Sequence, residues 1–138
     1  MKPSARGARV LLDTNVWVGL SNRRIHPSLL KRMVGEFTLL VPTLVLSELS
    51  SLERRGVVRS GLAAKVARSG KVVPLSAEAA IAGGALHGKA RRASSRGIGL
   101  VDALLIAVAR SEGARILTTD EGLGDYRDAT LVPLEGAA

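Results

Sequence analysis

The segment Val10-Leu11-Leu12-Asp13 joins a short apolar run to an acidic residue, and the same pattern recurs along the chain. Residues 9–12 are predicted to form a buried strand, because the run is apolar and contains a β-branched residue. Residues 14–20 are predicted to begin a helix, with Asp13 or Thr14 near its N-cap. An ionised carboxylate beside a hydrophobic core is costly unless it is paired or metal-bound, so Asp13 is a candidate functional residue.

Outward from this segment, strand-like and helix-like stretches alternate. The alternation predicts an α/β fold in which a central parallel sheet of roughly four to five strands carries helices on both faces. The length of 138 residues suits a single domain, which we expect to span residues 1–138. Further strands are expected at 37–41, 71–74, 114–119 and 130–134, and further helices at 27–36, 42–55, 58–68, 76–92 and 100–112.

Three more carboxylates adjoin apolar runs. Glu48 lies inside a predicted helix, Asp102 opens another, and Asp120 directly follows a predicted strand. In open α/β sheets, sites form at the carboxyl ends of the strands, where Asp13 and Asp120 should both lie. If the fold brings the four acids together, their repulsion raises their pKa values, and a divalent cation removes that penalty. Oxygen ligands alone favour a hard ion, so the four acids predict an Mg²⁺ or Mn²⁺ site.

Each acid also has a purely structural interpretation. Asp13 and Asp120 could be turn or N-cap residues, and Asp102 could simply oppose the dipole of its helix. Glu48 could be an exposed residue of an amphipathic helix. Four such acids together are harder to explain in this way than any one of them alone.

The charge of the chain is strongly basic and unevenly distributed. The formal net charge is +8, which favours polyanionic partners. Residues 54–99 carry ten of the 20 basic residues and a single acid, Glu78. One interpretation of this basic segment is a surface that binds a polyanion, and the alternative is a solvated surface without a partner. Candidate phosphate contacts in this basic segment are Arg54, Arg55, Arg59, Arg91, Arg92 and Arg96.

Composition excludes several other classes of protein. The chain has no cysteine, which excludes thiolate chemistry and fits a cytoplasmic protein. Two histidines make a histidine-based zinc site or a Ser-His-Asp triad improbable. No apolar stretch reaches membrane-spanning length, so no membrane partner is expected. Aromatic residues are too few for a base-stacking platform, and we interpret Trp17 as a core residue.

Four stretches, in order, resemble the motifs of the PIN-domain family. They cover nearly the whole chain at the spacing of that family. The resemblance implies a Mg²⁺- or Mn²⁺-dependent ribonuclease, and short members of this kind are often VapC-like toxins of toxin–antitoxin pairs. The stretches are Leu11-Leu12-Asp13-Thr14-Asn15-Val16-Trp17, residues 41–49 around Glu48, residues 99–107 around Asp102, and Ile116-Leu117-Thr118-Thr119-Asp120.

By position, this resemblance implies that Asp13, Glu48, Asp102 and Asp120 form the catalytic, metal-binding cluster. It also implies that Asn15 and Thr118 are polar supports, although ordinary turn and strand chemistry would explain both. Glu121 or Asp125 is a candidate fifth ligand, and the sequence does not choose between them. The implied partners are an RNA substrate, a second copy of the chain and an antitoxin protein. The alternatives are an inactive nucleic-acid-binding or interaction module and a housekeeping RNA-processing nuclease of the same fold.

Overall fold

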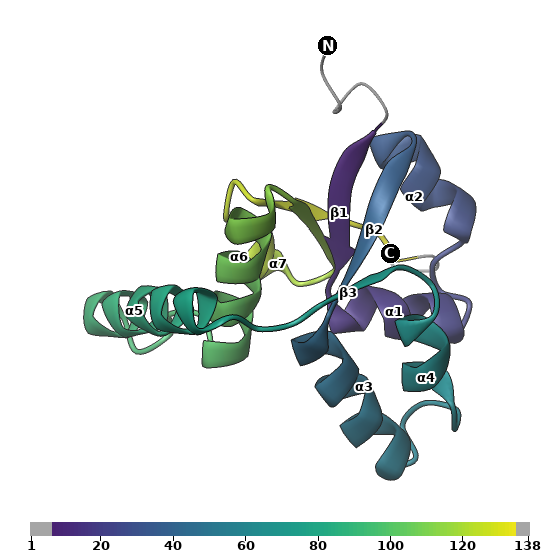
Figure 1. The fold of residues 1–138 in the computed structure, drawn as a ribbon, viewed down its shortest axis with the longest axis horizontal. Coiled ribbons are helices and arrows are strands. Elements are labelled where there is room, and N and C mark those ends of the chain that lie inside the picture. Colours follow the sequence, from purple (N-terminus) through teal and green to yellow (C-terminus); the bar gives the residue numbers. More distant parts are fainter. Residues whose placement is uncertain (1–6, 135–138) are drawn as a thin grey trace.

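The computed structural model describes residues 7–134, which form a five-stranded parallel sheet with helices on both faces (Figure 1). The strands lie in the order β3-β2-β1-β4-β5, and β1 is central. In the register, Leu11 of β1 is paired with Leu40 on one side and Ile116 on the other. The predicted α/β class and parallel sheet are therefore confirmed. The bounds are β1 Ala8–Leu12, β2 Phe37–Pro42, β3 Lys71–Val73, β4 Arg115–Thr118 and β5 Ala129–Leu131.

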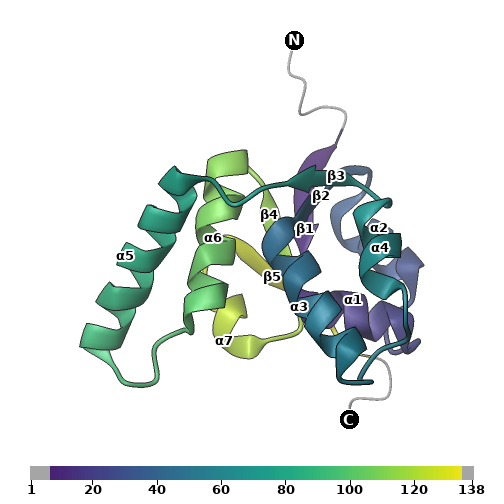
Figure 2. The same cartoon turned by 60° about the horizontal axis from the view of Figure 1, so that its bottom comes forward.

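Within residues 7–134, seven helices connect and cover these strands. Figure 2 shows α5 and α6 side by side at one end of the molecule, and α1, α3 and α4 gathered at the other. The closest helix packing is between α5 and α6, and α3 packs against α4. The bounds are α1 Thr14–Ser21, α2 Pro27–Val34, α3 Thr43–Arg54, α4 Leu62–Ala67, α5 Ala77–Ala93, α6 Leu100–Glu112 and α7 Glu121–Gly124.

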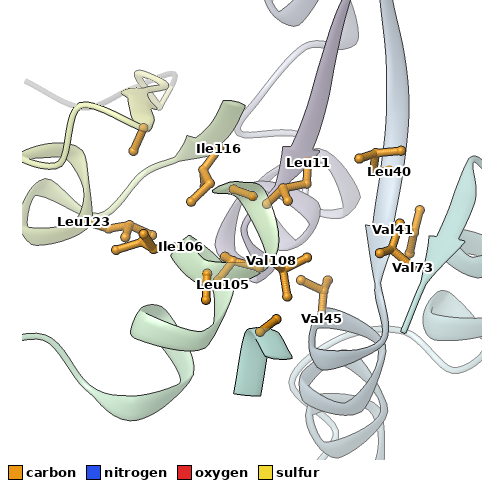
Figure 3. Close-up of a cluster of buried hydrophobic side chains, with 14 of the residues drawn as sticks. Leu11, Leu40, Val41, Val45, Val73, Leu105, Ile106, Val108, Ile116 and Leu123 are labelled. Carbon is orange, nitrogen blue, oxygen red and sulfur yellow. The ribbon is translucent and has the colours of Figure 1, made fainter. Parts of the chain in front are cut away.

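Two core clusters lie on opposite faces of the sheet, because alternate strand residues point to opposite sides. Leu11 and Ile116 belong to the larger cluster, which includes Leu105 and Ile106 of α6 (Figure 3). Leu12 and Leu117, the next residues along β1 and β4, belong to the smaller cluster. Its other buried members are Val16, Ile25, Leu30 and Val132. The central strands are thus buried on both sides, which explains their continuous apolar runs.

The order of the strands creates a switch point between β1 and β4. From β1, the chain proceeds outward to β2 and β3, and then returns to place β4 and β5 on the other side of β1. The connections that leave the carboxyl ends of β1 and β4 therefore diverge, and a crevice forms between them. This is the edge at which Asp13 and Asp120 lie.

The structure shifts the ends of several predicted elements by one or two residues, as in α2 and β4, and it differs more clearly in three others. The helix expected at 58–68 begins only at Leu62, because Gly61 adopts a left-handed conformation with φ of 89°. The backbone N–H groups of Ala63 and Gly61 donate to the Glu53 carboxylate, and these hydrogen bonds lower the pKa of Glu53. Helix α7 was not predicted, because four residues carry no helical periodicity. The last strand is Ala129–Leu131 rather than 130–134.

Gly83 explains the glycine pair inside α5. A Cβ atom at Gly83 would lie 2.8 Å from the Cα of Leu104, so the absent side chain lets α5 and α6 pack closely. A Cβ atom at Gly84 would meet nothing within 4 Å. On α5, Ile81 is 74% exposed. Among residues 7–134, no helix is both long enough and apolar enough to cross a membrane.

Candidate active site

The carboxyl ends of β1 and β4 bring Asp13 and Asp120 to one crevice. The Asp13 N–H donates to the Leu117 carbonyl at 2.8 Å, so the ladder between the two strands continues into the first residue of the site. Asp13 and Asp120 are also the N-caps of α1 and α7, and each accepts a backbone N–H from its own helix. The capping interpretation is therefore correct for both residues, and it places both carboxylates at the crevice.

Thr118 links these two acids. Its hydroxyl group, which is fully buried, donates to Asp13 Oδ2 at 2.8 Å and accepts the Asp120 N–H at 3.0 Å. Asp13 is itself only 6% exposed, and its other oxygen, Oδ1, accepts the Thr14 N–H at 2.8 Å. The side chain of Asp13 is thus held by two hydrogen bonds, and its orientation is fixed.

Glu48 reaches the crevice from the middle of α3. The Thr14 hydroxyl group, at the start of α1, donates to Glu48 Oε1 at 2.6 Å. Thr14 is buried and Glu48 is half-buried, so the exposed-helix interpretation of Glu48 is wrong. From the sequence, Thr14 is predicted only as a possible N-cap. Its position directly after Asp13 was the available signal, because a residue in the first turn of α1 also borders the crevice.

Asp102 enters from the first turn of α6. The N-cap of this helix is Gly99, and within residues 7–134 the Asp102 carboxylate accepts no capping hydrogen bond. Burial first, and then the charges of the other three acids, raise the pKa of Asp102 to about 6. Opposition to the helix dipole would favour the ionised form, so it does not account for this raised pKa.

The four acids line a single pocket of about 340 Å³. Burial is also the main cause of the raised pKa of Asp13, and the charges of Glu48 and Asp120 add to it. The hydrogen bonds from Thr118 and Thr14 act in the opposite direction, because they stabilise the ionised form. The residues lining the pocket are Asp13, Thr14, Asn15, Glu48, Ser51, Leu52, Arg55, Asp102 and Asp120.

The donor set has the chemistry of a site for a hard divalent cation. All of its charged donors are carboxylate oxygens, and two of the acids have raised pKa values that a bound cation would lower. Within residues 7–134, no three acidic or histidine side chains are placed to hold one ion together. Mg²⁺ is usually bound through one or two carboxylates, with waters and substrate phosphates as its other ligands, so the residues fit this ion.

The other candidate site residues are distributed unevenly around the pocket. Asn15 lines it, whereas Glu121 and Asp125 do not. Of the six candidate arginines, Arg55 alone lines it. It is the C-cap of α3, seven residues after Glu48, and it follows the part of the helix from which Ser51 and Leu52 also line the pocket.

The five other arginines lie away from the acids. Arg59 borders a second hollow, and Arg54 is exposed at the end of α3. Arg91 donates to the carbonyl oxygens of Ser95 and Ile98, so it holds the loop between α5 and α6. Arg92 and Arg96 are exposed close to this loop.

Comparison with known proteins gives the family. The model of the PIN domain matches residues 10–129, which include all four acids. The chain therefore belongs to the PIN-domain family, as its motifs predicted. No curated protein matches the chain.

Solved structures share the fold at low sequence identity. A chain of VapBC2 from Rickettsia felis, bound to a DNA fragment from its promoter, is 22% identical with a TM-score of 0.66, covering 92% of this chain and 99% of that one. VapBC-1 from nontypeable Haemophilus influenzae gives 16% identity and a TM-score of 0.69, with coverage of 91% and 97%. VapC20 from Mycobacterium tuberculosis, a sarcin-ricin loop cleaving toxin, gives 22% identity and a TM-score of 0.62, with coverage of 83% and 92%.

Proposed function

We propose that this protein is a divalent-metal-dependent endoribonuclease and the toxin of a toxin–antitoxin pair. The observation that carries the proposal is the convergence of four carboxylates, from four separate elements, on one pocket at the switch point of the sheet. Such a concentration of negative charge is unfavourable without a cation. Membership of the PIN-domain family supports the same conclusion.

Asp13, Glu48, Asp102 and Asp120 would surround the ion, which we propose to be Mg²⁺ or Mn²⁺. One or two of these carboxylates would bind the ion directly, and the others would act through bound waters. When bound, such an ion polarises a phosphodiester and lowers the pKa of a bound water. The carboxylates bind in their ionised forms, so Asp102, with its pKa of about 6, must lose its proton. Metal affinity should therefore increase as the pH rises through this value.

The neutral and basic residues of the pocket have separate tasks. The Thr118 hydroxyl group orients Asp13, and the Thr14 hydroxyl group orients Glu48. Such hydrogen bonds hold ligands in place before the ion arrives. Arg55 provides the one positive charge in the lining, and we expect it to contact a phosphate of the RNA beside the acids.

The antitoxin is proposed from a structural neighbour, and the homodimer is proposed from the family of the chain. A toxin–antitoxin complex from Klebsiella pneumoniae shares the fold, with 15% identity and a TM-score of 0.67, which supports an antitoxin partner for this chain. Membership of the PIN-domain family supports the proposed homodimer. Light scattering at micromolar concentration should give the mass of two chains, and a monomer alone would refute the dimer.

Cleavage of a labelled single-stranded RNA tests the proposed activity. The wild-type protein should cleave with Mg²⁺ or Mn²⁺ and stop when EDTA is added. Asp13→Asn and Asp102→Asn should lose activity by at least about 10²-fold while the circular dichroism spectrum is unchanged. Asp125→Asn, an exposed acid outside the pocket, is the matched control and should cleave normally. Full activity in EDTA would refute the proposal.

A further inference from the structure

A second hollow, of about 350 Å³, lies between α1 and α4. Its apolar lining comes from Trp17 and Leu20 of α1 and from Leu62 and Val66 of α4. We call this hollow the Trp17 groove. Trp17 packs against both core clusters, yet its side chain remains partly exposed. The volume lies in the range of sites that bind one small ligand.

The charged residues that line the Trp17 groove are all positive. Arg23, Arg59 and Lys65 line it, and no acidic residue does. All three basic side chains belong to exposed residues, and no salt bridge within residues 7–134 involves them. A groove with an apolar wall and a basic rim complements a ligand that combines a flat apolar group with an anionic one.

The Trp17 groove adjoins the acidic pocket. Helix α1 lines both hollows, with Thr14 and Asn15 in the pocket and Trp17 one turn further along in the groove. The segment that follows α3 also borders both, with Arg55 in the pocket and Arg59 in the groove. Figure 2 shows α1, α3 and α4 meeting at one corner of the molecule. The two hollows are therefore linked by the same two segments of the chain, with one arginine of the second segment in each hollow.

We propose that the Trp17 groove binds a nucleotide of single-stranded RNA next to the bond that is cleaved at the acidic pocket. Arg59 and Lys65 contact its phosphates, and its base lies against Trp17 and the apolar wall. The inference rests on the proposed ribonuclease function. RNA is favoured over a protein segment because the charged residues of the lining are all basic, and because Arg55 adds a further positive charge in the adjoining acidic pocket. Stacking on one aromatic side chain tolerates any base, so this subsite would add affinity rather than sequence specificity.

Trp17 is the chain's single tryptophan, so its fluorescence reports on the groove directly. The test uses Asp102→Asn in Mg²⁺, so that RNA binds without being cleaved. A short single-stranded oligoribonucleotide should change the emission of Trp17 and protect it from quenching by acrylamide. Trp17→Leu should weaken binding by about tenfold, measured by fluorescence anisotropy of labelled RNA.

Variants of the rim keep the test independent of the folding of Trp17→Leu. Arg59→Gln and Lys65→Gln should each weaken binding and make the slope of log affinity against log salt shallower by about 0.7. Arg68→Gln is the matched control, because Arg68 is exposed at the end of α4 but does not line the groove. The control should keep both the affinity and the slope of the wild type.

The outcomes separate this inference from the proposed function. Normal cleavage by the wild-type protein, with unchanged Trp17 emission and unchanged binding in the rim variants, would overturn the inference and leave the ribonuclease in place. Changed Trp17 emission that is lost in Arg59→Gln, without cleavage by the wild type under any metal condition, would support the groove and refute the ribonuclease.

Discussion

The acidic pocket and the basic segment 54–99 hold their charges in opposite ways. Asp13 and Glu48 are fixed by hydrogen bonds from buried threonines and come from elements anchored in the core. The six candidate arginines are all exposed. Arg55 and Arg59 line hollows, Arg54 lies at the end of α3, and the other three lie at or near the loop held by Arg91. The position of an acid beside an apolar run is fixed, because the neighbouring apolar residues must be buried. Burial does not fix the position of a charged residue on an exposed helix in this way.

The largest effect that we predict from this difference is a loss of cleavage when the two threonines that orient the acids are replaced. Thr118→Val and Thr14→Val should each reduce cleavage by about 10–100-fold, because the acids they orient lose a hydrogen bond. Thr118→Val should also raise the pKa of Asp13, and so shift the rise of the pH–rate profile to higher pH. Thr38→Val, on an exposed part of β2, is the control. An unchanged rate in Thr118→Val would show that this orientation is unimportant.

A smaller effect should separate the two ends of the basic segment. Arg55→Gln should raise KM several-fold and make the salt slope of RNA binding shallower by about 0.7, because Arg55 lines the acidic pocket. Arg91→Gln should leave the slope unchanged and lower Tm by a few degrees, because it loses hydrogen bonds worth about 1 kcal/mol each. If Arg91→Gln changed the salt slope and Arg55→Gln did not, the RNA contact would belong to Arg91 and not to Arg55.

The smallest effect is a pH dependence of stability in the metal-free protein. The folded state raises the pKa of Asp102 to about 6, above the ordinary value near 4, so it binds a proton more tightly than the unfolded state. This contribution is fully present only below the ordinary value of 3.8, and it is lost progressively as the pH rises from there through about 6. The loss should be roughly 1–2 kcal/mol once solvent screening of this half-buried side chain is allowed for.

Thermal melting from pH 4 to pH 7 measures this contribution. The wild type should lose roughly 3–8 °C relative to Asp102→Asn across this range. Asp13 should still contribute in the same direction in both proteins, since burial raises its pKa too. Parallel melting curves for the two proteins at every pH would contradict the raised pKa of Asp102.

The sequence was informative where burial left few alternatives. The apolar runs beside Asp13 and Asp120 predicted strands, and the adjacency of β1 and β4 then brought the two acids together. Arg55 was not distinguished from Arg54 or Arg91, although its position seven residues after Glu48, at the end of the same helix, was an available signal. The hydrogen bond between Thr14 and Glu48 joins residues that are 34 positions apart in the sequence. It depends on how α1 and α3 pack together, and no local sequence pattern encodes that packing.

Calorimetric titration with Mn²⁺ tests most directly the claim that the four acids form one metal site. The wild type and the control Asp125→Asn should bind Mn²⁺ with the same affinity, and the affinity should increase between pH 5 and pH 7 as Asp102 loses its proton. Replacement of any one of the four acids by its amide should weaken binding by at least about tenfold. Equal Mn²⁺ affinity in the wild type and in all four amide variants would contradict the account. These variants are Asp13→Asn, Glu48→Gln, Asp102→Asn and Asp120→Asn.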